Sequence, residues 1–318
     1  MSLRVAVQMD PLESINISGD STFAIMLKAQ ELGHKLYHYL AEDLTWQDGR
    51  LYGGAHEVTI RPVPGDHYQR GDFAILDLGK DVDVVLMRQD PPFDLGYITA
   101  THLLERIQDE TLVVNDPAAV RNAPEKVWVL DFSRFMPPTM VTRSLGAARK
   151  FAAEHGEVVL KPLHGNAGKA VFKIGDDGAN LSALMELFNA TYREPHMLQA
   201  FLPEVADGDK RIILIDGKFA GAINRRPASG DIRSNLAAGG TAEAAELTET
   251  EREICEALGP ELERRGLLFV GIDVIGGRWL TEINVTSPTG IVAVDKFNGT
   301  NTAGLIWDAI ERRVAQRG

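Results

Sequence analysis

The chain has 318 residues, of which 44% are hydrophobic and 25% are charged, close to the average for globular proteins, so disordered and fibrous chains are excluded. Its 45 acidic and 33 basic residues give a net charge of −12, which argues against nucleic acid as a general partner. The single cysteine, Cys255, excludes an intrachain disulfide. Because there is no signal-peptide pattern and no apolar run of about 18 residues, we expect a cytoplasmic protein without a membrane span.

The first third of the chain alternates between strand and helix patterns. Asp20 or Ser21 can cap the first helix, and Gly33 can end it. Such alternation predicts an α/β domain with an open parallel sheet over residues 1–122. The expected strands are 3–9, 34–40, 82–87 and 111–114, and the expected helices are 23–32 and 98–107.

The pattern changes after residue 122 to one typical of α+β structure, which we divide into units 123–198 and 199–318. Asp216-Gly217 between two strand patterns predicts a type I′ hairpin, and Thr248 with Glu251 predicts a capping box. Residues 227–241 are rich in Gly, Ser and Ala, and a loop of this length favours a mobile, functional segment. The expected strands are 139–142, 158–161, 170–174, 210–215 and 218–223, and the expected helices are 125–131, 145–154 and 180–190.

The segment VGIDVIGGRWLTEINVTSPTG, residues 270–290, predicts a hairpin that carries carboxylates. A two-residue turn at Gly276-Gly277 would pair Asp273 with Leu280 and place Glu282 as its diagonal neighbour. Asn284 would then share their face. Two carboxylates and an amide oxygen suit Mg²⁺, whereas the alternative is the polar outer face of an ordinary hairpin. The apolar run LLFVGIDVI favours the metal, because a buried charge needs a partner.

A second segment, VVLKPLHGNAGKAVFKI at residues 158–174, predicts two strands around a glycine turn. Lys161 closes the first strand, and the amides of the Gly165–Gly168 turn could approach phosphate oxygens, although an ordinary turn fits equally well. The segment is not a P-loop, because the glycine spacing is too short and a strand follows. No dinucleotide fingerprint follows the first strand, and no zinc or serine-hydrolase motif is present.

Several cations fall in expected loops and strand ends: Lys126, Lys161, Arg211, Arg225, Arg226 and Arg233. In an acidic protein, arginines beside a glycine-rich loop suit the recognition of carboxylates and phosphates. For any single arginine, solvated surface charge is the alternative.

Taken together, the chain resembles the ATP-grasp ligases, specifically the bacterial glutathione synthetases. The resemblance covers almost the whole sequence, and its combination of segments is highly specific. The matching segments include Met9-Asp10-Pro11, Met87-Arg-Gln-Asp-Pro-Pro-Phe-Asp94, Gly208-Asp-Lys-Arg211, Asn235-Leu-Ala-Ala-Gly-Gly240 and LTEINVTSP at 280–288.

The resemblance implies an N-terminal open-sheet domain, an ATP-grasp lid subdomain and a C-terminal ATP-grasp subdomain with the metal site. It implies an ATP-dependent C–N ligase that joins γ-glutamylcysteine to glycine through an acyl phosphate, and a homotetramer. The alternatives are an ATP-grasp ligase with another amine or peptide acceptor, a non-catalytic nucleotide-binding protein and a dinucleotide oxidoreductase. The intact set of cations and carboxylates disfavours the non-catalytic protein, and the missing fingerprint disfavours the oxidoreductase.

The resemblance also implies roles for individual residues. The catalytic group is Arg211, Arg225 and Arg233; the ATP site is Lys126, Lys161, Gly165, Gly168, Gln199, Ala200, Phe201, Leu202 and Asp209; and the ligands of Mg²⁺ or Mn²⁺ are Asp273, Glu282 and Asn284. Residues 226–241 would close over the site. The chain departs from the family pattern at His164 and Lys169 in the phosphate turn, and at Val292-Ala293.

Overall fold

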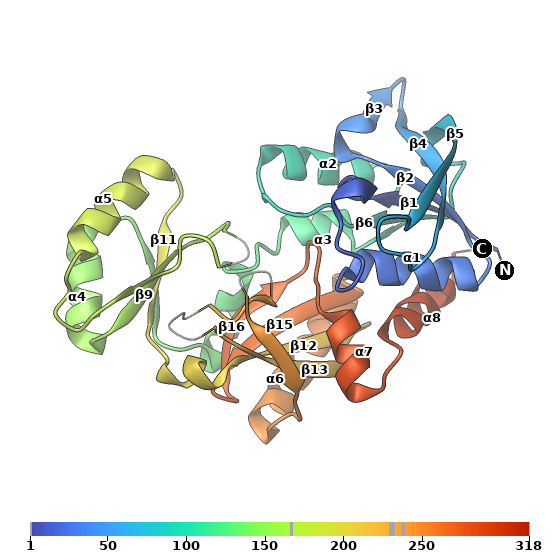
Figure 1. Ribbon diagram of the computed structural model, residues 1–318. Coiled ribbons are helices and arrows are strands. Elements are labelled where there is room, and N and C mark those ends of the chain that lie inside the picture. Colours follow the sequence, from blue (N-terminus) through green and yellow to red (C-terminus); the bar gives the residue numbers. More distant parts are fainter. Residues whose placement is uncertain (1, 166–167, 229–232, 237–238, 318) are drawn as a thin grey trace.

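The computed structural model describes residues 2–165, 168–228, 233–236 and 239–317. Within these ranges the strands form three sheets, which Figure 1 shows at the upper right, the left and the lower centre of the molecule. No described helix combines the length and the apolar character needed to cross a membrane.

The first sheet contains seven of the described strands in the order β3-β4-β2-β1-β6-β7, with β5 paired to β4. Its centre is parallel, because β1 pairs with β2 and β6, and β6 pairs with β7. The three antiparallel strands β3, β4 and β5 extend it on one side and were not predicted. The strands are β1 Arg4–Gln8, β2 Lys35–Tyr39, β3 Leu44–Gln47, β4 Arg50–Ile60, β5 Tyr68–Asp77, β6 Val84–Met87 and β7 Leu112–Val114.

Helices α1 (Ser21–Glu31), α2 (Leu95–Glu105) and α3 (Pro117–Arg121) accompany this sheet. The predicted cap of the first helix is confirmed, since the Asp20 carboxylate accepts a hydrogen bond from the Phe23 amide at 2.6 Å. The last helix, α8 (Thr302–Ala315), packs against α1 (Figure 1). Its fully buried Trp307 donates to the Ile25 carbonyl at 2.8 Å, so the end of the chain is fixed to its beginning.

The second sheet contains four antiparallel strands in the order β10-β9-β11-β8 within the described residues. They are β8 Thr139–Thr142, β9 Val158–Pro162, β10 Phe172–Ile174 and β11 His196–Ala200, and α4 (Leu145–His155) and α5 (Leu181–Thr191) accompany them. The helix expected at residues 125–131 is wrong in place and type. The chain instead forms the 3₁₀ helix η3 (Trp128–Phe135), with a kink at Phe132 where φ is −110°.

The third sheet contains five of the described strands in the order β14-β13-β12-β15-β16, all antiparallel. The predicted type I′ turn is confirmed, because Asp216 and Gly217 both have positive φ, 50° and 74°. The capping box of Thr248 and Glu251 is also confirmed. The elements are β12 Asp209–Ile215, β13 Lys218–Arg226, β14 Thr241–Ala244, α6 Glu249–Arg264, β15 Phe269–Ile275, β16 Trp279–Asn284 and α7 Ile291–Asn298.

Candidate active site

The turn between β15 and β16 is one residue longer than predicted. Gly276 and Gly277 have φ values of 61° and 69°, and the Arg278 amide donates to the Ile275 carbonyl at 3.3 Å. Ile275 consequently pairs with Trp279 instead of Arg278. The expected two-residue turn is therefore wrong, because the chain closes its loop with a third residue.

A β-bulge on β16 adds a second shift of one residue. The extra residue is Thr281, whose hydroxyl donates to the Asp273 carbonyl at 3.1 Å. Asp273 therefore lies directly opposite Glu282, and Leu280 pairs with the next residue of β15 and faces the other side. The diagonal position predicted for Glu282 and the face predicted for Leu280 are wrong. The shared face of Asp273, Glu282 and Asn284 is retained, because two single shifts restore the alternation of a strand.

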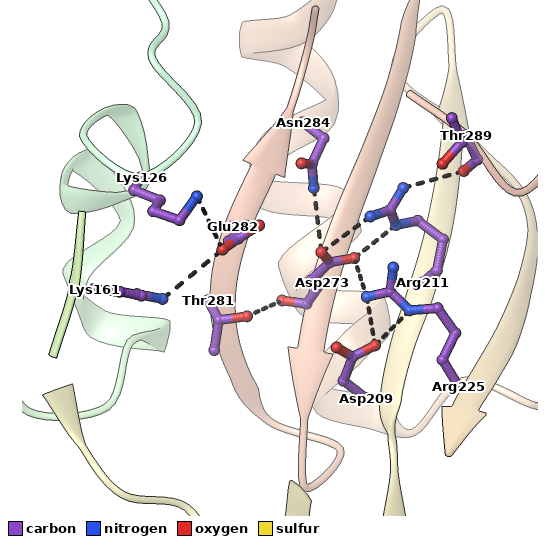
Figure 2. A network of polar contacts seen from close by, with 10 residues as sticks. All are labelled: Lys126, Lys161, Asp209, Arg211, Arg225, Asp273, Thr281, Glu282, Asn284 and Thr289. Carbon is purple, nitrogen blue, oxygen red and sulfur yellow. Dashed lines mark hydrogen bonds and ion pairs between the residues drawn. The ribbon is translucent and has the colours of Figure 1, made fainter. Parts of the chain in front are cut away.

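Arginines surround the Asp273 carboxylate, which is 4% exposed (Figure 2). Arg211 donates to both of its oxygens, with Nε–Oδ1 at 2.6 Å and Nη2–Oδ2 at 3.1 Å, and Arg225 lies 2.9 Å from Oδ1. Asn284 donates its amide to Oδ2 at 3.3 Å. Burial opposes ionisation here, but the two guanidinium groups outweigh it and hold the pKa of Asp273 well below its usual range.

Asp209, on β12, is a second carboxylate that contacts one of these arginines. It accepts a hydrogen bond from Nε of Arg225 at 2.6 Å. Burial, together with the negative charge of Asp273, outweighs the effect of Arg225 and raises the pKa of Asp209 to about 6. Two arginines and two aspartates thus form one buried network at the ends of β12, β13 and β15.

Two lysines from the other side approach Glu282 (Figure 2). Nζ of Lys126 lies 3.3 Å and Nζ of Lys161 lies 3.9 Å from Oε1 of Glu282. Lys126 follows α3 and donates to the Gly165 carbonyl at 2.6 Å, whereas Lys161 belongs to β9 of the second sheet. Both lysines are less than 10% exposed, and burial lowers the pKa of Lys161 to about 8.

A cavity of about 130 Å³ lies between the second and third sheets, beside these lysines. Every residue predicted for the ATP site lines it: Lys126, Lys161, Gly165, Gly168, Gln199, Ala200, Phe201, Leu202 and Asp209, together with Arg233, Asp273 and Glu282. The cavity is lined by apolar residues at and after the end of β11 and by the buried Lys126 and Lys161. This arrangement suits a ligand with a flat apolar part and an anionic tail.

The glycine turn packs against the described part of the loop predicted at residues 227–241. A Cβ atom added at Gly168, where φ is 70°, would lie 3.0 Å from Cδ of Arg233 and 2.9 Å from Oδ1 of Asn235. Glycine therefore allows the turn and the loop to approach closely. Residues 166–167, 229–232 and 237–238 lie outside the described residues, so closure of this loop over the site stays a prediction.

A second cavity, of about 220 Å³, adjoins the first and shares Glu282 with it. Arg211, Arg225 and Asn284 line this second cavity. The structure therefore brings all the predicted catalytic and metal-binding residues to two neighbouring cavities, with Glu282 lining both.

Two carboxylates that the sequence analysis did not single out also line the second cavity. Glu125 accepts a hydrogen bond from the Thr286 hydroxyl at 2.9 Å, and burial raises its pKa. Asp90 lines the same cavity, and burial raises its pKa as well. Two features of the sequence could have identified them: Glu125 adjoins Lys126, and Asp90 lies within the Met87–Asp94 segment. A cavity with both arginines and carboxylates suits a zwitterionic ligand such as an amino acid or a short peptide.

Asp273, Glu282 and Asn284 share the face that the sequence predicts to hold a divalent cation. In the described parts of the chain, no three side chains among His, Cys, Asp and Glu gather closely enough to hold a metal. Two carboxylates and one amide nevertheless fit Mg²⁺, which takes few protein oxygens and completes its shell with phosphates and water.

The chain matches family models over nearly its whole length. Residues 3–121 match the N-terminal domain of prokaryotic glutathione synthetase, and residues 125–299 match its ATP-grasp domain. It is 55% identical to glutathione synthetase of Rhodopseudomonas palustris, over 99% of this chain and 100% of that protein. It is 41% identical to the Vibrio parahaemolyticus enzyme of the same name, over 98% and 99% of the two chains.

Solved ligase structures share the fold at low sequence identity. D-cycloserine synthetase DcsG superposes with a TM-score of 0.70 at 18% identity, covering 98% of this chain and 99% of that one. D-alanyl-alanine synthetase A of Vibrio cholerae superposes with a TM-score of 0.63 at 14% identity, covering 99% and 98%. These likenesses confirm the predicted mixed α/β architecture of an ATP-grasp protein.

Proposed function

The chain belongs to the prokaryotic glutathione synthetase family, and from that premise we propose that it joins γ-glutamylcysteine to glycine at the expense of ATP. The observation that carries the proposal is the pair of opposed carboxylates, of which Glu282 lines both cavities and Asp273 lines the first. Lysines of the first cavity contact Glu282, and arginines of the second cavity hold Asp273. A site of this kind places an anionic nucleotide tail next to a carboxylate substrate.

The first step is transfer of the γ-phosphoryl group of ATP to the cysteine carboxylate of the dipeptide. ADP leaves, and the carboxylate becomes an acyl phosphate, which is a much better electrophile. Lys126 and Lys161 would exchange Glu282 for phosphate oxygens, because their contacts with this carboxylate are the longest ion pairs of the site, at 3.3 and 3.9 Å. Positioned positive charge is the main contribution of protein to phosphoryl transfer.

The second step is attack of the glycine nitrogen on the acyl carbon. A C–N bond forms, the bond to the phosphate oxygen breaks, and phosphate leaves. Arg211 and Arg225 line the second cavity with their guanidinium groups fixed by Asp273, so they can stabilise the oxyanion that forms on the acyl oxygen. Arg233 lines the first cavity, where it would stabilise the transferring phosphoryl group.

Members of this family use ATP with a divalent metal. We propose that the metal is Mg²⁺ or Mn²⁺ and that Asp273, Glu282 and Asn284 hold it. When bound, it would neutralise charge on the phosphate oxygens. Asp273 is available to this set as an anion, since its arginines hold its pKa low.

We propose that the chain divides into units near residues 122 and 199, with β11 spanning the second boundary.

We also propose that the chain assembles as a homotetramer. Phe73 and Ile75 support the assembly, because they are 60% and 70% exposed on one face of the edge strand β5. Light scattering after size-exclusion chromatography tests the tetramer. A monomer with intact activity would contradict it.

The function is tested by measuring ADP release and product mass across a panel of dipeptides and amines. We expect one ADP per tripeptide, and the highest kcat/KM with γ-glutamylcysteine and glycine. Equal or better turnover with another amine would favour the alternative, an ATP-grasp ligase with a different acceptor. Absence of ADP release with every donor would contradict ligase activity altogether.

A further inference from the structure

Arg88 directly follows β6 and is a buried cation that the reaction scheme above does not use. It is 6% exposed, and among the described residues no carboxylate lies within 4 Å of it. Its guanidinium donates from Nε to the Thr22 hydroxyl at 3.0 Å and from Nη2 to the Pro288 carbonyl at 2.8 Å. It also lies 5.1 Å from the ring centre of Phe269. Asp20 and Asp90 act on its charge from beyond that distance, so the guanidinium is buried without a direct ion pair. Burying a cation in this way is costly, which calls for a reason beyond packing.

The segment that Arg88 contacts, residues 287–290, forms one wall of the second cavity. The N-terminal part of the chain holds this segment at both ends. The Ser287 hydroxyl donates to the Arg88 carbonyl at 3.2 Å, and the Gly290 amide donates to the Ser21 hydroxyl at 3.0 Å. The wall of the cavity is thus fixed to the beginning of α1 and the end of β6.

Arg211 binds the same segment from the other side. Its Nη1 donates to the Thr289 carbonyl at 3.1 Å, while Nε and Nη2 bind Asp273 (Figure 2). The consecutive carbonyls of Pro288 and Thr289 therefore accept hydrogen bonds from two arginines, one directly after β6 of the first sheet and one on β12 of the third.

We propose that Arg88 is a positioning residue for ligation: by fixing the Pro288 carbonyl, it holds the Thr289 carbonyl in place and so orients Arg211 toward the reacting carboxyl group. The inference rests on the proposed function, because it assigns Arg211 to the reacting group. Arg211 has three donor nitrogens, and each has a fixed acceptor in this arrangement. Displacing one acceptor rotates the guanidinium, and a displacement of about 1 Å near reacting atoms can reduce the rate about 100-fold.

The primary test is Arg88→Lys, which keeps the charge but loses the planar fork. We expect kcat to fall about 10- to 100-fold, with KM for ATP unchanged, because Arg88 lines neither cavity. In a double-mutant cycle with Arg211→Lys, the double variant should be no slower than Arg211→Lys alone. Additive effects would overturn the inference. A raised KM for the dipeptide with unchanged kcat would also overturn it, since Arg88 would then bind substrate directly.

A second variant, Thr22→Val, tests the same inference if Arg88→Lys does not fold. Thr22→Val removes the acceptor of Arg88 Nε and is nearly isosteric. The matched control is Thr111→Val, since Thr111 is also a buried threonine and its hydroxyl donates to the Leu78 and Val82 carbonyls, away from Arg88. We expect both variants to lose similar stability, and kcat to fall only in Thr22→Val. Equal kcat in both would show that Arg88 is purely structural. Failure of the proposed function would instead appear in the wild-type protein, as absence of ADP release.

Discussion

Asp273 and Glu282 lie directly opposite each other on neighbouring strands, yet their surroundings differ. Asp273 has a side chain 6% exposed and accepts charge-assisted hydrogen bonds at 2.6 and 3.1 Å. Glu282 has a side chain 24% exposed, and its lysine partners lie at 3.3 and 3.9 Å. One carboxylate is therefore bound tightly to its cations, whereas the other can exchange them.

The difference separates two tasks that adjacent carboxylates perform in one site. Asp273 keeps two buried arginines oriented, because bidentate arginine–carboxylate pairs are geometrically specific. Glu282 pairs with two buried lysines, and in the proposed mechanism phosphate oxygens replace it. The tightly held arginines thus belong to the third sheet, which contains both carboxylates, whereas the loosely held lysines come from outside this sheet.

The comparison predicts that Asp273→Asn loses more stability than any other single change in the site. Arg211 and Arg225 would be left as buried cations without their shared anion. We expect the free energy of unfolding to fall by about 3–5 kcal/mol and ligation to be lost with it. Urea denaturation followed by circular dichroism measures the change. A variant as stable as the wild type would show that the arginines do not depend on Asp273.

Glu282→Gln should give the opposite result, with a stable protein that is almost inactive. We expect kcat for ligation to fall at least about 1,000-fold, because the proposed metal site loses a charged oxygen. The free energy of unfolding should fall by less than about 3 kcal/mol, because the Glu282 side chain is 24% exposed and its contacts with the two buried lysines are long. Titrating Mg²⁺ against ADP release measures the effect.

The matched control for Glu282→Gln is Glu243→Gln, which breaks the exposed pair with Arg226 on the same sheet, at 2.9 Å. It should leave ADP release and its dependence on Mg²⁺ unchanged. Full activity of Glu282→Gln at low Mg²⁺ would refute the assignment of Glu282 to the metal.

Arg225→Lys tests whether the network around Asp273 depends on the planar shape of the arginine side chain. Lysine keeps the charge but cannot contact Asp209 and Asp273 at once with a planar fork. We expect a loss of about 1–3 kcal/mol in the free energy of unfolding, from the buried acceptors left unpaired. Thermal unfolding measures it, and Arg226→Lys is the exposed control. If both variants lose the same free energy of unfolding, a positive charge alone is enough to stabilise the network around Asp273.

Local features of this fold could be predicted from the sequence because they depend on a few neighbouring residues. Asp20 at the start of α1, the Asp216-Gly217 turn and the capping box of Thr248 and Glu251 are examples. The strands β3, β4 and β5 could not be predicted in the same way. They pair with each other and with β2 at the edge of the first sheet, and they lack the long apolar runs that mark its centre.

The site shows the same division between local and distant causes. The residue types and the shared face of Asp273 and Glu282 follow from the alternation of a strand. Their direct opposition depends on a three-residue turn and a bulge, which the sequence pattern alone does not fix. The position of Glu125 and Asp90 in the second cavity was not predicted, because segments far apart in the chain bring them together there.

Thr281→Val, finally, tests whether the bulge keeps the two carboxylates opposed. The Thr281 hydroxyl donates to the Asp273 carbonyl, and valine has nearly the same shape without that donor. We expect a loss of about 1 kcal/mol in the free energy of unfolding. Because the backbone pairing of Asp273 with Glu282 remains, kcat should fall less than 10-fold, from a small displacement of Glu282. Denaturation and steady-state kinetics on one preparation measure both effects. A fall in kcat as large as that of Glu282→Gln would mean that the hydroxyl, and not the strand pairing, sets the position of Glu282.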